Sequence, residues 1–124
     1  MDAVELKYHR DNTRVFIGFK PSSIELIPQT RERTTGGGWK YLPDEPREPQ
    51  IFRIIELGAN TTPPIIVTTD GKQREVEFWL LGEWDANMAV DDTWVASDGR
   101  EWLVGDIVRP NGYETRGLVV ERGK

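Results

Sequence analysis

The chain contains no cysteine and a single histidine, His9. The lack of thiols excludes disulfides, thiolate nucleophiles and Cys-ligated zinc, so core packing must supply the stability. No apolar run reaches the length of a signal peptide or a membrane-spanning helix, and we expect a protein that is made in the cytoplasm and has no contact with a membrane. His9 lies in a hydrophilic N-terminal segment, and no serine or acid is placed beside it by the sequence, which gives no support to nucleophilic catalysis.

The apolar content is nevertheless sufficient for one folded core. The chain has 124 residues, 37% of them hydrophobic, which predicts a single domain spanning residues 1–124. Its charge is uneven: residues 1–53 hold nine Lys/Arg and eight Asp/Glu, whereas residues 54–124 hold seven and thirteen. An acidic body joined to a near-neutral half suits docking between unlike surfaces better than wrapping nucleic acid, with an ordinary solvated surface as the alternative.

The second half has the pattern of a β-meander. Short β-rich runs are separated by the turn pairs Asp70-Gly71, Asp98-Gly99 and Asn111-Gly112, in which glycine accepts a positive φ. The expected strands cover residues 65–68, 74–81, 93–96, 101–104, 107–108 and 113–120, and Gly105-Asp106 indicates a β-bulge or barrel corner. This pattern predicts an all-β fold, a small single-domain β-barrel.

The first half is less regular. Residues 15–17, 24–27 and 51–57 are expected to form short strands, and no stretch shows helical periodicity beyond two turns. Residues 30–50 contain Gly36-Gly37-Gly38 and the prolines 43, 46 and 49, so they cannot form a long helix or a central strand. They are predicted to be a long Gly/Pro-rich inter-strand loop, a feature that in compact domains is usually functional or disordered.

This loop is the candidate docking or channel segment. The glycines resemble a phosphate cradle, but Trp39 follows them and Tyr41 follows Lys40, which does not match a Walker loop. We interpret the loop instead as a mobile arm with charged and aromatic contacts, and a merely flexible loop is the alternative. The candidate residues are Arg31, Arg33, Gly36, Gly37, Gly38, Trp39, Lys40 and Tyr41.

Other constellations favour no enzyme, cofactor or metal site. Residues 85–92 begin like a calcium loop, but Ala89 stands at the fifth position of the loop, the sixth position lacks glycine and no helices flank the segment, so a polar connection between strands is expected. Trp94 and Trp102 are expected in the core. Trp39, Trp79 and Trp84 leave open an alternative function, an OB-like module that binds single-stranded nucleic acid, against which the acidic balance argues.

Most of the chain resembles a known family. Leu80-Leu81-Gly82-Glu83-Trp84-Asp85, Asp91-Asp92-Thr93-Trp94, Asp98-Gly99-Arg100-Glu101-Trp102 and Arg109-Pro110-Asn111-Gly112-Tyr113-Glu114 resemble segments of the head-to-tail stopper (head completion) proteins of tailed phages, especially phages of actinobacterial hosts. Residues 30–50 are similar to the N-terminal half of those proteins. The shared motifs are patterns of turns and strands.

The resemblance implies a virion structural protein of the head-tail connector. Such a protein is a small β-barrel that assembles as a homo-oligomeric, twelvefold ring below the portal and adaptor proteins. The ring retains the packaged double-stranded DNA and offers a docking surface to the tail terminator protein. A long inter-strand loop can project into the channel, and residues 30–50 are the candidate for that loop here.

Overall fold

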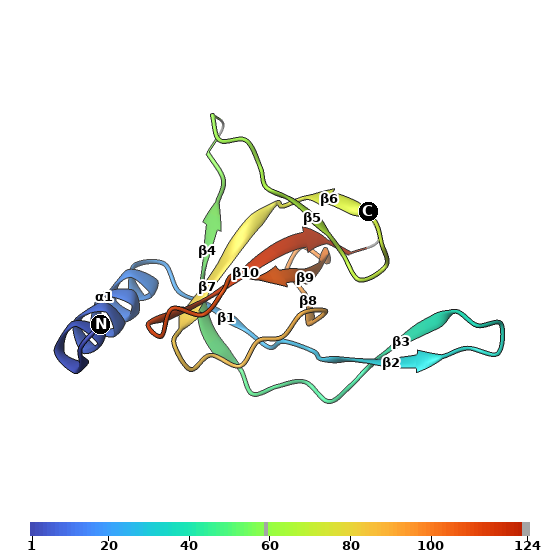
Figure 1. Ribbon diagram of the computed structural model, residues 1–124, viewed down its shortest axis with the longest axis horizontal. Helices are drawn as coiled ribbons and strands as arrows, with labels where there is room; N and C mark the ends of the chain where they lie inside the picture. Colours follow the sequence, from blue (N-terminus) through green and yellow to red (C-terminus); the bar gives the residue numbers. More distant parts are fainter. Residues whose placement is uncertain (59, 123–124) are drawn as a thin grey trace.

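The computed structural model describes residues 1–58 and 60–122 and consists mainly of β-strands (Figure 1). The elements in chain order are α1 (Ala3–Phe19), β1 (Ser22–Ile24), β2 (Gln29–Arg33), β3 (Trp39–Pro43), β4 (Gln50–Glu56), β5 (Ile65–Val67), β6 (Gln73–Glu75), β7 (Phe78–Glu83), β8 (Thr93–Val95), β9 (Glu101–Ile107) and β10 (Glu114–Glu121).

Six strands form an antiparallel sheet in the order β1-β4-β7-β10-β9-β8. Its two edges meet where Ile27, just after β1, pairs with Thr93 at the start of β8. The Ile27 amide donates to the Thr93 carbonyl at 2.8 Å, and the Thr93 amide donates back at 3.0 Å. The sheet is therefore nearly closed, which confirms the predicted small, all-β, barrel-like fold.

The barrel interior holds the main core. Phe52, Leu80 and Val104 are among its fully buried side chains. Trp94 and Trp102 both pack edge-on against Phe78, with ring centroids 6.1 and 4.7 Å from it. Edge-to-face contacts of this kind are favourable beyond the area they bury. The prediction that Trp94 and Trp102 are core residues is confirmed.

A second, smaller core lies under the β5–β6 hairpin. Ile66, Val76 and Val120 are buried there, and Trp79 packs against them. The predicted strand over residues 74–81 is divided, because the Val76 amide bonds to Pro64 while the Glu77 amide bonds to Val119. One part of the segment thus serves the hairpin as β6 and the other serves the barrel as β7.

The predicted turns and the bulge are found where the sequence indicated them. Gly71, Gly99 and Gly112 have φ values of 84°, 86° and 86°, in the region that glycine adopts without steric cost. Opposite β10, Leu118 pairs with Asp106 and the next residue pairs with Val104, which leaves Gly105 as the extra residue of a bulge.

The N-terminal helix corrects the expectation that no helix exceeds two turns and that residues 15–17 form a strand. Asp2 caps α1, its carboxylate accepting a hydrogen bond from the Glu5 amide at 2.8 Å. Thr13 and Ile17 are buried, whereas other large apolar side chains of α1 are exposed. Because apolar residues lie on two opposite faces, the helical period is blurred in the sequence. Within the described residues, no helix has both the length and the apolar character to cross a membrane.

Residues 30–50 also differ from expectation, because they are not an irregular loop throughout. β2 and β3 form a two-stranded hairpin that is separate from the barrel sheet, and residues 44–49 return the chain to β4. No residue of β2 or β3 is buried, so neither face of the hairpin packs on a core. The alternation of apolar and polar residues that identifies a strand is therefore missing from this part of the sequence.

Close packing inside the barrel predicts that Gly82→Ala is destabilising. A Cβ at Gly82 would lie 2.7 Å from Cε1 of the fully buried Phe52 and 2.8 Å from the Cβ of Ala86. We expect a loss of about 1–3 kcal/mol in the free energy of unfolding, measured with urea. Gly36→Ala is the matched control, since a Cβ there meets no atom within 4 Å. Equal stabilities of the two variants would contradict the packing described here.

Candidate functional site: the projecting arm and its anchor

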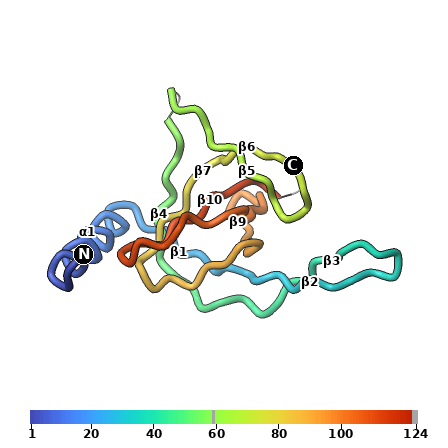
Figure 2. The backbone as a smooth tube through the Cα atoms, in the orientation of Figure 1, coloured from blue at the N-terminus to red at the C-terminus, as the bar shows by residue number. Residues whose placement is uncertain are grey.

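The β2–β3 hairpin, residues 29–43, extends away from the barrel and is referred to here as the arm (Figure 2). Its tip is a tight turn in which the Thr34 amide bonds to the Gly38 carbonyl at 2.9 Å and Gly37 has a φ of 84°. Of the three glycines, Gly37 is therefore the one whose backbone conformation the turn requires. The tip is compact, and flanking residues 30–33 and 39–42 are paired.

The register of the hairpin gathers the predicted contact residues on one face. Arg31 is paired with Tyr41, and Arg33 with Trp39. Directly paired residues, and residues two apart on one strand, project from the same side of a sheet. These four residues therefore share one side of the arm, which we call the arginine–aromatic face.

The arginine–aromatic face is open to solvent and partly ordered by its own contacts. Trp39 is 51% exposed, and the guanidinium carbon of Arg31 lies 4.1 Å from the centroid of its indole ring. Cation–π contact of this kind holds both side chains extended along the strand surface. Of the other predicted residues, Lys40 is paired with Glu32 and lies on the opposite face, and Gly36, Gly37 and Gly38 form the tip.

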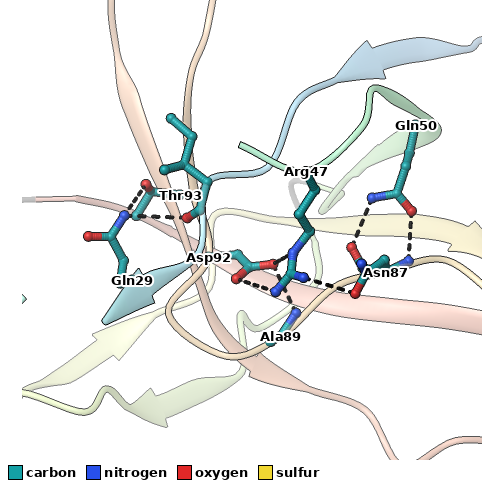
Figure 3. A network of polar contacts seen from close by, with 8 residues as sticks. Gln29, Arg47, Gln50, Asn87, Ala89, Asp92 and Thr93 are labelled. Carbon is teal, nitrogen blue, oxygen red and sulfur yellow. Dashed lines mark hydrogen bonds and ion pairs between the residues drawn. The ribbon is translucent and has the colours of Figure 1, made fainter. Parts of the chain in front are cut away.

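A buried ion pair fixes the end of the arm segment (Figure 3). Arg47 Nε and Nη2 donate to Asp92 Oδ2 and Oδ1 at 2.9 and 3.1 Å. The side chain of Asp92 is 2% exposed and that of Arg47 is 20% exposed. Asp92 Oδ2 also accepts from the Ala89 amide at 3.0 Å. The carboxylate is thus bound by three donors, as a buried charge requires.

Neighbouring polar contacts extend this pair to both roots of the arm. On one side, Gln50 and Asn87 exchange hydrogen bonds of 2.8 and 2.7 Å between side chain and backbone. On the other, Gln29 Nε2 donates to Thr93 Oγ1 at 3.0 Å. Figure 3 shows these contacts converging on the segment between β7 and β8. The set, referred to here as the anchor, comprises Gln29, Arg47, Gln50, Asn87, Asp92 and Thr93.

The anchor was not found by sequence reasoning. Arg47 and Asp92 are 45 residues apart, and no spacing rule connects an arginine after a Pro-rich loop with an aspartate before a strand. The segment 85–92 was interpreted as a polar connection between strands, which matches its position between β7 and β8.

A pocket of about 250 Å³ lies at the root of the arm. Gln29 and Tyr41 of the arm line it, together with Asp70 and Arg74 of the β5–β6 hairpin. A hydrogen bond from the Thr68 hydroxyl holds the pKa of the Asp70 carboxyl below its usual range. Within residues 1–58 and 60–122, no cluster of three or more potential His, Cys, Asp or Glu ligands is placed to bind a metal ion.

The tryptophans of the alternative nucleic-acid function occupy different environments. Trp39 is exposed on the arm. Trp79 packs against the second core, and Trp84 is covered by Arg10, whose guanidinium carbon lies 3.9 Å from the ring centroid. Trp39 is the most exposed of the three at 51%, although Arg31 lies over its ring as Arg10 lies over that of Trp84, which is 45% exposed.

Comparison of the chain with protein families, with curated proteins and with solved structures finds no match. Function must therefore be inferred from the arm and its anchor together with the likeness that the sequence motifs carry.

The buried geometry of the Arg47–Asp92 pair predicts a large cost for Asp92→Asn. The substitution leaves the guanidinium without its charge partner. We expect the free energy of unfolding, measured with urea, to fall by about 3 kcal/mol. Hydrogen exchange should also become faster at the Arg47 amide, which bonds to the Leu26 carbonyl at 2.8 Å.

The matched control is Lys7→Met, which breaks the exposed Lys7–Asp11 pair, whose side chains are 78% and 48% exposed. That change should cost no more than about 0.5 kcal/mol. If Asp92→Asn costs as little as Lys7→Met, the anchor does not hold the root of the arm.

Proposed function

We propose that this chain is a virion structural protein of the head-tail connector, a head-to-tail stopper. Copies form a homo-oligomeric ring, twelvefold by the family likeness, below the portal and adaptor proteins. The ring retains packaged double-stranded DNA and offers a docking surface to the tail terminator. The observation that carries the proposal is a solvent-exposed arm with an arginine–aromatic face, held at both roots by the anchor, whose Arg47–Asp92 pair is buried, on a small barrel.

The chemistry of the arm suits contact with another protein. Arginine, tryptophan and tyrosine are the residues most enriched where single side chains dominate binding energy. A two-stranded hairpin with exposed hydrogen bonds is marginally stable alone, so the arm is able to adjust to its partner while its roots stay fixed. These properties favour an arm that docks on a neighbour or closes a channel.

The charge of the body suits passage of DNA. A channel densely lined with Lys and Arg would hold phosphates tightly, because each neutralised phosphate releases counterions. Residues 54–124 carry thirteen acidic and seven basic side chains, and these residues supply β7 to β10 of the barrel together with the separate β5–β6 hairpin. An acidic ring wall repels the duplex and permits it to slide.

A stop codon early in the reading frame tests the function in the phage that encodes this chain. Electron microscopy of the lysate should show heads that have packaged but leak DNA, together with unattached tails. Complementation with the intact chain should restore joined particles. Fully joined particles in the absence of the protein would contradict the proposed stopper function.

The arm itself is tested by the double variant Arg31→Ala/Trp39→Ala. Because Trp39 is 51% exposed, we expect the urea midpoint to stay unchanged. We expect the double variant to lose about 2 kcal/mol of the free energy with which the arm binds its neighbour, which is about thirtyfold weaker binding at each copy. Complementation of the phage by this variant should therefore fail. Arg109→Ala, in the connection between β9 and β10, is the control and should complement. Normal complementation by the arm variant would exclude the arm as a docking element.

The alternative is binding of single-stranded nucleic acid, which the exposed Trp39 beside Arg31 favours. It predicts that an oligonucleotide quenches tryptophan fluorescence in a salt-sensitive manner and that Trp39→Ala removes most of the quenching. Absence of quenching at low salt would eliminate this function.

A further inference from the structure

The turn between β9 and β10 contains the one Asn-Gly pair of the chain, Asn111-Gly112, and both residues are exposed. The side chain of Asn111 is held by its own turn. Its Oδ1 accepts hydrogen bonds from the amides of Tyr113 and Glu114, each at 3.0 Å, which is the pattern of an Asx turn. Its Nδ2 donates to Glu114 Oε1 at 3.1 Å. Both ends of the side-chain amide are therefore polarised by fixed partners.

Gly112 places a nucleophile beside this amide. Its backbone nitrogen follows Asn111 directly in the chain, so attack on the Asn111 Cγ is intramolecular and needs no encounter between molecules. Glycine has no Cβ to crowd the approach. The Gly112 amide has no hydrogen-bond acceptor among residues 1–58 and 60–122, so no existing bond has to break before the nitrogen reacts.

We propose that Asn111 is a site of spontaneous deamidation that its own turn promotes. The Gly112 nitrogen loses its proton and bonds to the Asn111 Cγ, and negative charge develops on Oδ1, to which two backbone amides already donate. The bond between Cγ and Nδ2 then breaks, and Nδ2 takes up a proton and leaves as ammonia. A cyclic imide remains, and water opens it at one carbonyl or the other to give aspartate or isoaspartate at this position.

The products alter the seat of helix α1. The Gly112 carbonyl accepts a hydrogen bond from Arg10 Nε at 2.9 Å, and the ring centroids of Tyr113 and His9 are 5.0 Å apart. Isoaspartate adds a carbon atom to the backbone and so displaces Gly112 from Arg10. Either product also places a carboxylate beside that of Glu114, and like charges in contact repel. The attachment of α1 is therefore expected to loosen in deamidated molecules.

Peptide mapping of the folded protein measures the reaction. The protein is kept at mildly alkaline pH in water labelled with heavy oxygen, and mass spectrometry follows the conversion of amide to acid at each asparagine. Asn12 and Asn60 are internal controls, because both are exposed and each is followed by a threonine, whose branched Cβ crowds the attacking nitrogen. We expect Asn111 to react at least about tenfold faster than either control. Uptake of heavy oxygen and formation of isoaspartate identify the route through the imide.

The contribution of the turn is measured by repeating the reaction with the chain unfolded in guanidinium chloride, where both donors to Oδ1 are lost. We expect the folded chain to react about tenfold faster at Asn111 than the unfolded chain. The inference is overturned if folding does not accelerate the reaction, or if Asn111 reacts no faster than Asn12 and Asn60.

The effect on α1 is measured by hydrogen exchange. Deamidated molecules separate from intact ones by ion exchange, because each conversion adds one negative charge. Amides of α1 should exchange about tenfold faster in the deamidated fraction. Asn60→Asp, in the connection between β4 and β5, adds the same charge and should leave this exchange unchanged. Asn111→Gln should suppress the deamidated fraction, since the longer side chain cyclises more slowly. Unchanged exchange in α1 of deamidated molecules would overturn the proposed effect on the helix.

Discussion

The whole arrangement depends on two adjacent residues at the start of β8. The backbone of Thr93 pairs with Ile27 and closes the barrel, while the side chain of Asp92 binds Arg47. The arm segment leaves the barrel at Ile27 and returns at Arg47, so both of its ends are attached at one place. A bidentate guanidinium–carboxylate pair fixes orientation as well as distance. Apolar side chains of similar volume would fill the same space without imposing that direction.

This attachment divides the arm into a rigid root and an adaptable tip. Near the barrel, the Asp44 and Arg47 amides bond to the Pro28 and Leu26 carbonyls, each at 2.8 Å. Farther out, β2 and β3 have only each other as strand partners. Local stability falls where buried apolar contacts are few and backbone hydrogen bonds are exposed. The direction of the arm is therefore set by the barrel, and its detailed shape is free to adjust to a surface that it meets.

The sequence predicted what local chemistry determines and missed what depends on distant partners. The turns at Gly71, Gly99 and Gly112 and the bulge at Gly105 follow from conformational preference, and all four are present. Helix α1 was missed because its two apolar faces cancel the period that identifies a helix. The arginine–aromatic face needed the pairing register of residues 31–41, although its residues had been selected from composition. The Arg47–Asp92 contact has no local signal, because tertiary structure alone brings the two residues together.

The uneven charge of the sequence becomes a spatial division in the fold. Residues 1–53 supply both projections, α1 and the arm, which lie at opposite ends of the long axis (Figure 1). Residues 54–124, in which acidic side chains outnumber basic ones, supply β7 to β10, four of the six barrel strands, and the separate β5–β6 hairpin. In the proposed ring, a projection that carries arginine and aromatic residues would meet the acidic body of the next copy more favourably than a projection like itself. Such a contact between unlike surfaces would be heterologous, and heterologous contacts close into a ring when the rotation per copy permits, whereas a contact between two like projections would stop at a pair.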